Sequence, residues 1–208
     1  MERVRRRSRV LDAQAPLKDL RDIKVLVFHP DNQDGLQLIQ QLQRIGCQVQ
    51  AFWPPLPVLP ERTEVVFLAI RPDALDVNFE WLKTEDEPTL IAVVDFENPT
   101  IVEAVIKANA KAILPLPIRT FGLLSTLVVA RELNVRMKEQ QKKLRKVEEK
   151  LLGVQRITEA KNILMRMHGI SDADAYKLMR GQAMSKRTTV EDIAAAIISA
   201  DGILSFEK

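Results

Sequence analysis

The segment 156–204 contains three short helical patterns separated by clear stop signals. Gly169 is suited to the left-handed position after the first helix, and Ser171 and Thr189 are good N-cap residues for the second and third. Each pattern carries only a few apolar residues, and many of these are alanine. Small residues allow helix axes to approach closely. The segment therefore predicts a tight three-helix bundle with a small core.

The sequence before this bundle predicts one long helix, because it has no glycine between residues 123 and 152. Residues recur there in steps of three and four, which is the heptad seam of a coiled coil. Ala130, Gln140 and Val154 belong to the seam, together with five residues expected to pair two copies of the chain: Leu133, Met137, Leu144, Val147 and Leu151. The alternative is a helix packed on its own domain. The dense charge on the other faces argues against it, because a monomer would leave the seam exposed.

Strand and helix patterns alternate in the first half of the chain. The predicted strands are 23–28, 47–53, 65–70, 89–94 and 111–114, and the predicted helices are 34–46, 75–83 and 99–109. The stretch 54–62 is too rich in proline for a helix of any length. This alternation is typical of an α/β domain with a doubly wound parallel sheet.

The composition excludes several classes of protein. Among 208 residues, 46% are apolar and 28% charged, which is ordinary for a soluble globular chain. The net charge of +3 is weak evidence for a nucleic-acid ligand by itself. Cys47 is the only cysteine, so we expect no internal disulfide and a reducing, cytoplasmic location. No apolar run is long enough to span a membrane, and no secretion signal is evident.

The motifs of catalysis are also missing from the sequence. It has no nucleophile elbow, no glycine-rich phosphate loop and no paired-carboxylate cleft that we can place. His29 and His168 are far apart, so no metal cluster has support from ligand spacing. We therefore expect no enzyme, no cofactor and no metal.

The three-helix segment carries an ordered pattern of basic, small and apolar residues. It comprises Arg156, Ala160, Lys161, Leu164, Met165, Arg166, Gly169, Ala175, Tyr176, Met179, Arg180, Ala183, Met184 and Arg187. This pattern resembles the ANTAR domain, the RNA-binding module of the AmiR and NasR transcription antitermination regulators. Asn162 stands where many members carry glycine. Gly181 stands where a second basic residue is common, so the second helix is expected to make one fewer phosphate contact.

The resemblance implies that the chain binds hairpins in a nascent leader mRNA and prevents formation of the terminator hairpin. The residues expected to bind RNA are Arg156, Lys161, Arg166, Tyr176, Arg180, Lys186 and Arg187. Tyr176 has two interpretations that the sequence leaves open. Its ring could stack on an unpaired base, or it could pack between helices.

The α/β part resembles a receiver domain of the flavodoxin-like type that has lost its chemistry. His29 and Pro30 follow the first strand, where a phosphorylated receiver carries two acids. The phosphoacceptor position falls at Ala69, and the lysine before the last-loop proline falls at Leu116. Magnesium needs carboxylate oxygens. We therefore expect a pseudo-receiver that phosphorylation does not switch.

These patterns divide the chain into four segments. They are a basic arm (1–20), a pseudo-receiver (21–121), a coiled-coil dimerisation helix (122–154) and an ANTAR domain (155–208). The arm is more typical of a solvated tail than of an RNA contact. The stretch 44–55 resembles the amidase-operon branch of the family. That likeness implies a negative regulator, an amide sensor of the AmiC type that resembles periplasmic binding proteins.

Two other functions remain open from sequence. A DNA-binding regulator would need polar base-reading residues at the start of its recognition helix, and Asp172, Ala173 and Asp174 are a poor set for that purpose. A coiled-coil docking scaffold would have no RNA affinity, and changing Lys161 or Arg180 would then have no effect on it.

Overall fold

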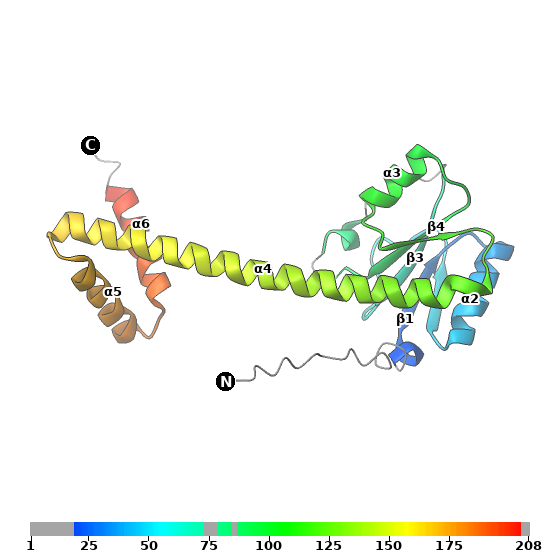
Figure 1. Cartoon of the computed structure of the whole chain (residues 1–208), viewed down its shortest axis with the longest axis horizontal. Coiled ribbons are helices and arrows are strands. Elements are labelled where there is room, and N and C mark those ends of the chain that lie inside the picture. The colour runs from blue at the N-terminus through cyan, green and yellow to red at the C-terminus, as the bar shows by residue number, and fades with distance from the viewer. Residues whose placement is uncertain (1–18, 73–78, 85–86, 205–208) are drawn as a thin grey trace, which may run out of the picture. The chain divides into compact units, whose positions relative to one another are not determined.

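The structure is a computed structural model that describes residues 19–72, 79–84 and 87–204 (Figure 1). The predicted basic arm therefore lies almost wholly outside the described residues. The chain divides into two compact units after Met137. Among the described residues, no helix is both long enough and apolar enough to cross a bilayer.

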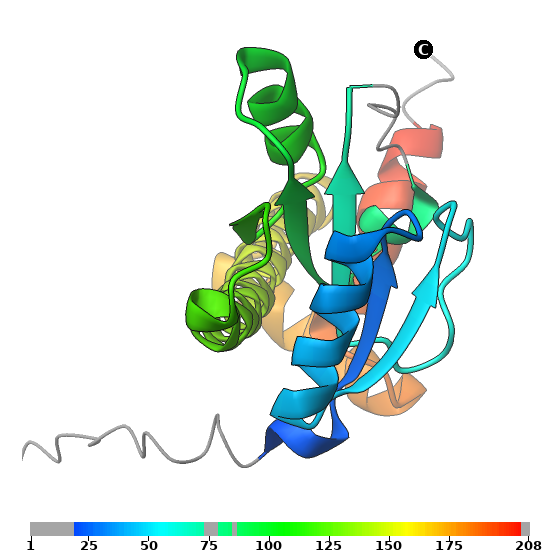
Figure 2. The same cartoon turned by 90° about the vertical axis from the view of Figure 1, so that its right-hand side faces the viewer.

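The first unit is built on a parallel sheet of five strands in the order β2-β1-β3-β4-β5 (Figure 2). The strands are β1 (Lys24–Phe28), β2 (Gln48–Phe52), β3 (Val65–Ile70), β4 (Thr89–Val94) and β5 (Ala112–Pro115). This order is the flavodoxin-like doubly wound arrangement. All five predicted strands are confirmed, and no bound differs by more than one residue.

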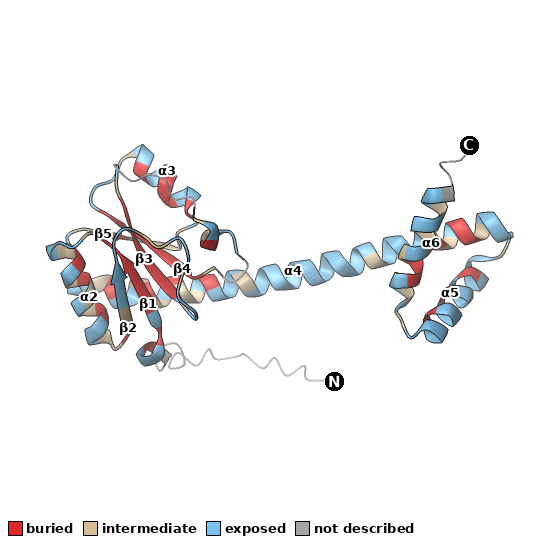
Figure 3. Cartoon of the chain, turned by 180° about the vertical axis from the view of Figure 1, so that it is seen from behind, coloured by how far each residue is buried: buried red, intermediate tan, exposed pale blue. Residues whose placement is uncertain are grey.

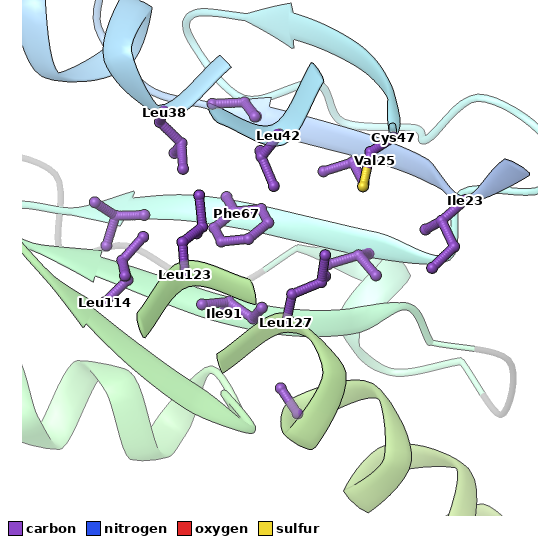
Figure 4. Packing of buried hydrophobic residues seen from close by; sticks show 14 of the residues in the cluster. Ile23, Val25, Leu38, Leu42, Cys47, Phe67, Ile91, Leu114, Leu123 and Leu127 are labelled. Carbon is purple, nitrogen blue, oxygen red and sulfur yellow. The ribbon is translucent and has the colours of Figure 1, made fainter. Parts of the chain in front are cut away.

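Both faces of the sheet are covered, which explains the continuous apolar runs of β3 and β4. One face packs against α2 (Gln33–Ile45) and the start of α4 (Thr120–His168), with Phe67 at the centre of the cluster (Figure 4). The other face packs against α3 (Pro99–Lys107). Trp81 belongs to this second cluster, and the centroids of the Trp81 and Phe28 rings are 6.1 Å apart.

Helix boundaries follow local capping chemistry. The Asn32 side chain accepts a hydrogen bond from the Gly35 N–H at the start of α2, and Gly46 ends that helix with φ 108°. The Asn98 side chain caps α3 in the same way, by accepting from the Ile101 N–H at 2.8 Å. Pro99 occupies the first turn, where its missing donor does no harm.

The predicted helix over 75–83 is wrong over the part that the structure describes. Only a short 3-10 turn, η2 (Glu80–Leu82), forms there, and residues 73–78 lie outside the described residues. A tertiary contact explains why the 3-10 turn forms instead. The Trp81 indole is buried and donates to the Leu56 carbonyl at 3.2 Å, so the turn is fixed by its contact with the proline-rich loop.

The proline-rich loop connects β2 to β3 without a helix. Leu56 and Leu59 pack against the second core cluster. A second 3-10 turn, η1 (Asp19–Asp22), precedes β1. The expectation that the proline-rich stretch forms no helix is confirmed.

Helix α4 is regular only after Gly122, because Phe121 (ψ 128°) and Gly122 (φ 99°) have non-helical backbone angles. Leu123, Leu127 and Ala130 then pack into the first core cluster. Ala130 was expected in the coiled-coil seam, and that assignment is wrong. Its side chain is fully buried against the sheet, because it continues the stripe that Leu123 and Leu127 begin.

The second unit contains a three-helix bundle formed by the end of α4, α5 (Asp172–Lys186) and α6 (Val190–Leu204) (Figure 3). Its core is small and rich in alanine: Ala160, Leu164, Ala175, Met179, Ala183, Ile193 and Ala194. The predicted caps are confirmed. The Ser171 hydroxyl accepts from the Asp174 N–H at 3.2 Å, and the Thr189 hydroxyl accepts from the Asp192 N–H at 3.1 Å.

Candidate nucleic-acid interface

One face of α5 carries an aromatic and a basic side chain at the surface. Tyr176, Arg180 and Met184 succeed one another at four-residue spacing, so they share a face of the helix. Tyr176 is 42% exposed and Met184 is 73% exposed, while Met179 on the inner face is fully buried. The bundle therefore anchors α5 by its small apolar residues and presents the tyrosine and arginine outward.

The turn after α5 extends this basic face. Arg187 ends the helix in the left-handed conformation, with φ 54°. Its N–H bonds to the Met184 carbonyl at 3.3 Å. Lys186 and Arg187 are both exposed in this turn. The turn thus places two cations directly after the last helical turn, where the helix dipole also favours positive charge.

Asp192, in the first turn of α6, bonds to the residues of this turn. Hydrogen bonds from the Thr189 and Thr188 hydroxyls, together with the Thr189 N–H, hold the pKa of Asp192 below its ordinary value. The two hydroxyl donors lie at 2.6 and 2.7 Å from Asp192 Oδ2. Asp192 therefore remains a carboxylate and acts as a helix cap.

Two of the predicted RNA-binding residues have carboxylate partners within the bundle. Lys161 Nζ lies 2.6 Å from Asp172 Oδ1, and the Lys161 side chain is only 19% exposed. Arg166 Nη2 donates to both carboxylate oxygens of Asp201 at 2.9 Å. Sequence reasoning missed both acids, because they lie 11 and 35 residues away from their partners.

The structure does not bring all seven predicted residues to one face. Arg156, Lys161 and Arg166 are five residues apart on α4, so successive members are roughly 140° apart around the helix. Arg156 and Arg166 are exposed. The most continuous candidate surface is therefore on α5 and the turn after it, formed by Tyr176, Arg180, Lys186 and Arg187.

The five predicted seam residues all lie exposed on α4. The exposed fraction is 45% at Leu133 and reaches 62% at Val147. Met137, Leu144 and Leu151 fall between these values. Large apolar side chains at heptad spacing are therefore left open along this helix.

A cavity of about 370 Å³ lies at the carboxyl ends of the strands. His29, Ala69 and Leu116, three of the four positions predicted for the degenerate phosphorylation pocket, line it together. The carbonyl oxygen of the fourth, Pro30, lies 3.0 Å from His29 Nδ1, within hydrogen-bonding distance. Within the described parts of the chain, no three His, Cys, Asp or Glu side chains gather to hold a metal.

Comparisons with known proteins agree with this organisation. The family described as AmiR, N-terminal, matches residues 23–131, and the ANTAR domain matches residues 145–198. The aliphatic amidase regulator of Pseudomonas aeruginosa is 30% identical over 190 residues, which cover 90% of this chain and 97% of that protein.

Solved receiver proteins are more distant. A CheY-like response regulator from Mesorhizobium loti has a TM-score of 0.41 and 18% identity over 52% of this chain and 98% of its own. A response regulator from Thermotoga maritima has a TM-score of 0.45 and 14% identity, over the same shares.

A receiver-like domain, followed by a long helix and an ANTAR module, defines a response-regulator-like transcription regulator. The match to the curated relative extends over nearly the whole length of both chains. The chain belongs to the AmiR/NasR family of transcription antitermination regulators.

Proposed function

We propose that the chain is an RNA-binding antiterminator that binds hairpins in a nascent leader mRNA and so prevents the terminator hairpin from forming. The observation that carries this proposal is the exposed tyrosine and arginine face of α5 within the ANTAR match. Sequence-specific RNA recognition mostly targets unpaired loop bases, which stack on aromatic rings and guanidinium planes. Tyr176 and Arg180 supply one of each.

The basic residues divide into two roles under this proposal. Lys186, Arg187 and Arg156 are exposed and contact phosphates. Lys161 and Arg166 also contribute positive charge, but each must exchange its carboxylate partner for a phosphate to make a direct contact. Until then these two side chains fix the helices of the bundle against one another.

Dimerisation through the α4 seam follows from the exposed leucines and valines. A row of large apolar side chains at heptad spacing is stabilised when it packs against a second copy. A dimer carries two ANTAR modules, and these suit two hairpins in one leader. Linking two binding events raises the effective concentration of the second, so affinity increases without any new contact.

Control by a partner, and not by phosphorylation, suits the first unit. Ala69 offers no carboxylate where a phosphoacceptor would stand, and Leu116 offers no amine. The relative is named for an aliphatic amidase. We therefore propose a ligand-sensing protein of the AmiC type, with a fold like periplasmic binding proteins, that silences the antiterminator until its inducer binds.

Binding to a leader RNA with two hairpins, across a salt series, tests the RNA function. A single hairpin and the matching DNA duplex serve as comparisons. Tight binding is expected only with both hairpins, and Arg180→Ala should weaken it. The salt slope, which is the slope of the logarithm of the binding constant against the logarithm of the salt concentration, should become shallower by about 0.9 unit or less. Lys107→Ala in the first unit is the matched control. Equal weak binding to all three nucleic acids would reject the proposal.

Incubation with acetyl phosphate tests the inert receiver. The intact mass of the chain should not change, because Ala69 cannot accept a phosphoryl group. A stoichiometric gain of one phosphoryl group would contradict control by a partner alone.

A further inference from the structure

Four lysines occur at four-residue intervals along α4: Lys138, Lys142, Lys146 and Lys150. Residues four apart are neighbours on a helix surface, so this lysine row is a continuous strip about 18 Å long. The row lies entirely in the second unit, which begins at Lys138. Lys138 is half-buried and the other three lysines are exposed.

The lysine row lies on the side of α4 away from the apolar seam. At 3.6 residues per turn, the centre of the row is roughly 160° around the helix from the five seam residues. A dimer that packs through the seam therefore leaves the row of each copy in solvent.

The four lysines of the row outnumber the two carboxylates, Glu139 and Glu149, that lie one helical turn from them on the same face. Like charges four residues apart repel one another on a helix. The ion pairs found among the described residues include none with Lys142, Lys146 or Lys150. Elsewhere Lys83 and Lys107 have glutamate partners one turn away, at 2.9 and 2.8 Å. An anionic ligand would remove this repulsion.

We propose that the lysine row binds the phosphate backbone of an RNA duplex stem. Duplex RNA is recognised mainly through phosphates and 2′-hydroxyls, without reading of sequence. A lysine that neutralises a phosphate also releases a condensed counterion, which makes such contacts favourable at low salt. The inference rests on the proposed function: the face with Tyr176 and Arg180 takes the hairpin loop, and the lysine row takes the stem.

The test uses the full chain with Lys142, Lys146 and Lys150 changed to glutamine, which has a similar helix propensity. A matched control changes Arg44, Lys83 and Lys107 to glutamine, so it removes the same charge from the first unit. Each protein is titrated with two-hairpin RNAs that share their loops and differ in stem length, and with the loop sequence as an unstructured strand. Helicity and oligomeric state are measured alongside.

Wild-type affinity should rise with stem length. The lysine-row variant should lose this rise, bind the longest stem about tenfold or more weakly, and show a salt slope lower by up to about 2.7 units. It should bind the unstructured strand as the wild type does. Equal effects of the two triple variants, or an equal loss on the unstructured strand, would overturn the inference while leaving the RNA function intact. A wild type that binds no hairpin would reject the proposed function, and the inference with it.

Discussion

Lys161 Nζ lies 2.6 Å from Asp172 Oδ1, so a lysine expected to contact RNA already holds an anion from its own chain. Asp172 is the first residue of α5, where the helix dipole favours a negative charge. Its side chain is 64% exposed, and that of Lys161 is 19% exposed. The pair joins α4 to α5 and competes directly with phosphate for the ammonium group.

Asp172→Asn is expected to strengthen RNA binding. The change frees Lys161 for a phosphate, and an exposed ion pair is worth at most about 1 kcal/mol, so the gain should be up to about fivefold. Fluorescence anisotropy with a labelled two-hairpin RNA measures this change in affinity. Glu159→Gln removes the same charge from α4 and is the control. Weaker binding by Asp172→Asn than by Glu159→Gln would mean that Lys161 serves only the bundle.

Leu151→Lys is expected to dissociate the dimer proposed through the α4 seam. An unpaired charge in a packed seam costs about 3 kcal/mol or more, which raises the dimer Kd at least about 100-fold. Leu152→Lys is the matched control, because Leu152 is also about half exposed (51%) but lies off the seam. Sedimentation equilibrium distinguishes the two. Similar effects from both variants would reject the seam.

The Asn134 side-chain amide donates to the Thr89 hydroxyl at 3.1 Å, and both residues are buried. Asn134→Leu and Thr89→Val should each destabilise the first unit by about 1–3 kcal/mol, because each leaves a buried polar group without its partner. The double variant should lower the free energy of unfolding by less than the sum of the two single variants. Denaturant unfolding of all four proteins gives this coupling energy. Additive costs would mean that the hydrogen bond contributes nothing.

Gly35→Ala is expected to destabilise the first unit. An added Cβ would lie 2.7 Å from the Pro30 carbonyl oxygen and 2.9 Å from His29 Nδ1, so the loop after β1 must shift, at about 1–3 kcal/mol. Gly181→Ala is the contrast. Nothing lies within 4 Å of a Cβ there, and alanine should stabilise α5 by about 0.5–1 kcal/mol. Opposite shifts of the two thermal midpoints are the expected result.

We expect the stability of the three-helix bundle to depend on pH through Asp192. Its pKa is lowered in the folded chain by the Thr189 and Thr188 hydrogen bonds. The resulting stability is present above the unfolded pKa of about 3.9 and is lost as the pH falls through the lower folded value. Asp192→Ala should therefore lower the unfolding midpoint at neutral pH, and the difference from wild type should narrow below about pH 4. A difference that is constant across the titration would contradict this linkage.

Much of the first unit was predictable from residue type alone. Strands β1, β3 and β4 are short apolar runs, and such a run is typical of a strand that is buried on both faces of a parallel sheet. The caps at Ser171 and Thr189 were equally local, because a side chain there bonds a backbone N–H within three residues. The helix prediction was wrong over 79–83, the described part of the segment, because the buried Trp81 bonds to the Leu56 carbonyl of a distant loop.

The parallel α/β domain, the long helix and the alanine-rich bundle could be predicted from the amino-acid sequence, because short-range periodicity and capping specify them. The group that each surface contacts could not be predicted in this way, because it depends on the packing of distant segments. Ala130 and Leu133 fit the same heptad pattern, but Ala130 packs on the sheet and Leu133 remains exposed. The carboxylates that hold Lys161 and Arg166 come from distant positions. Periodicity records which side of a helix is apolar or charged, whereas the identity of the contacting group depends on how distant segments pack.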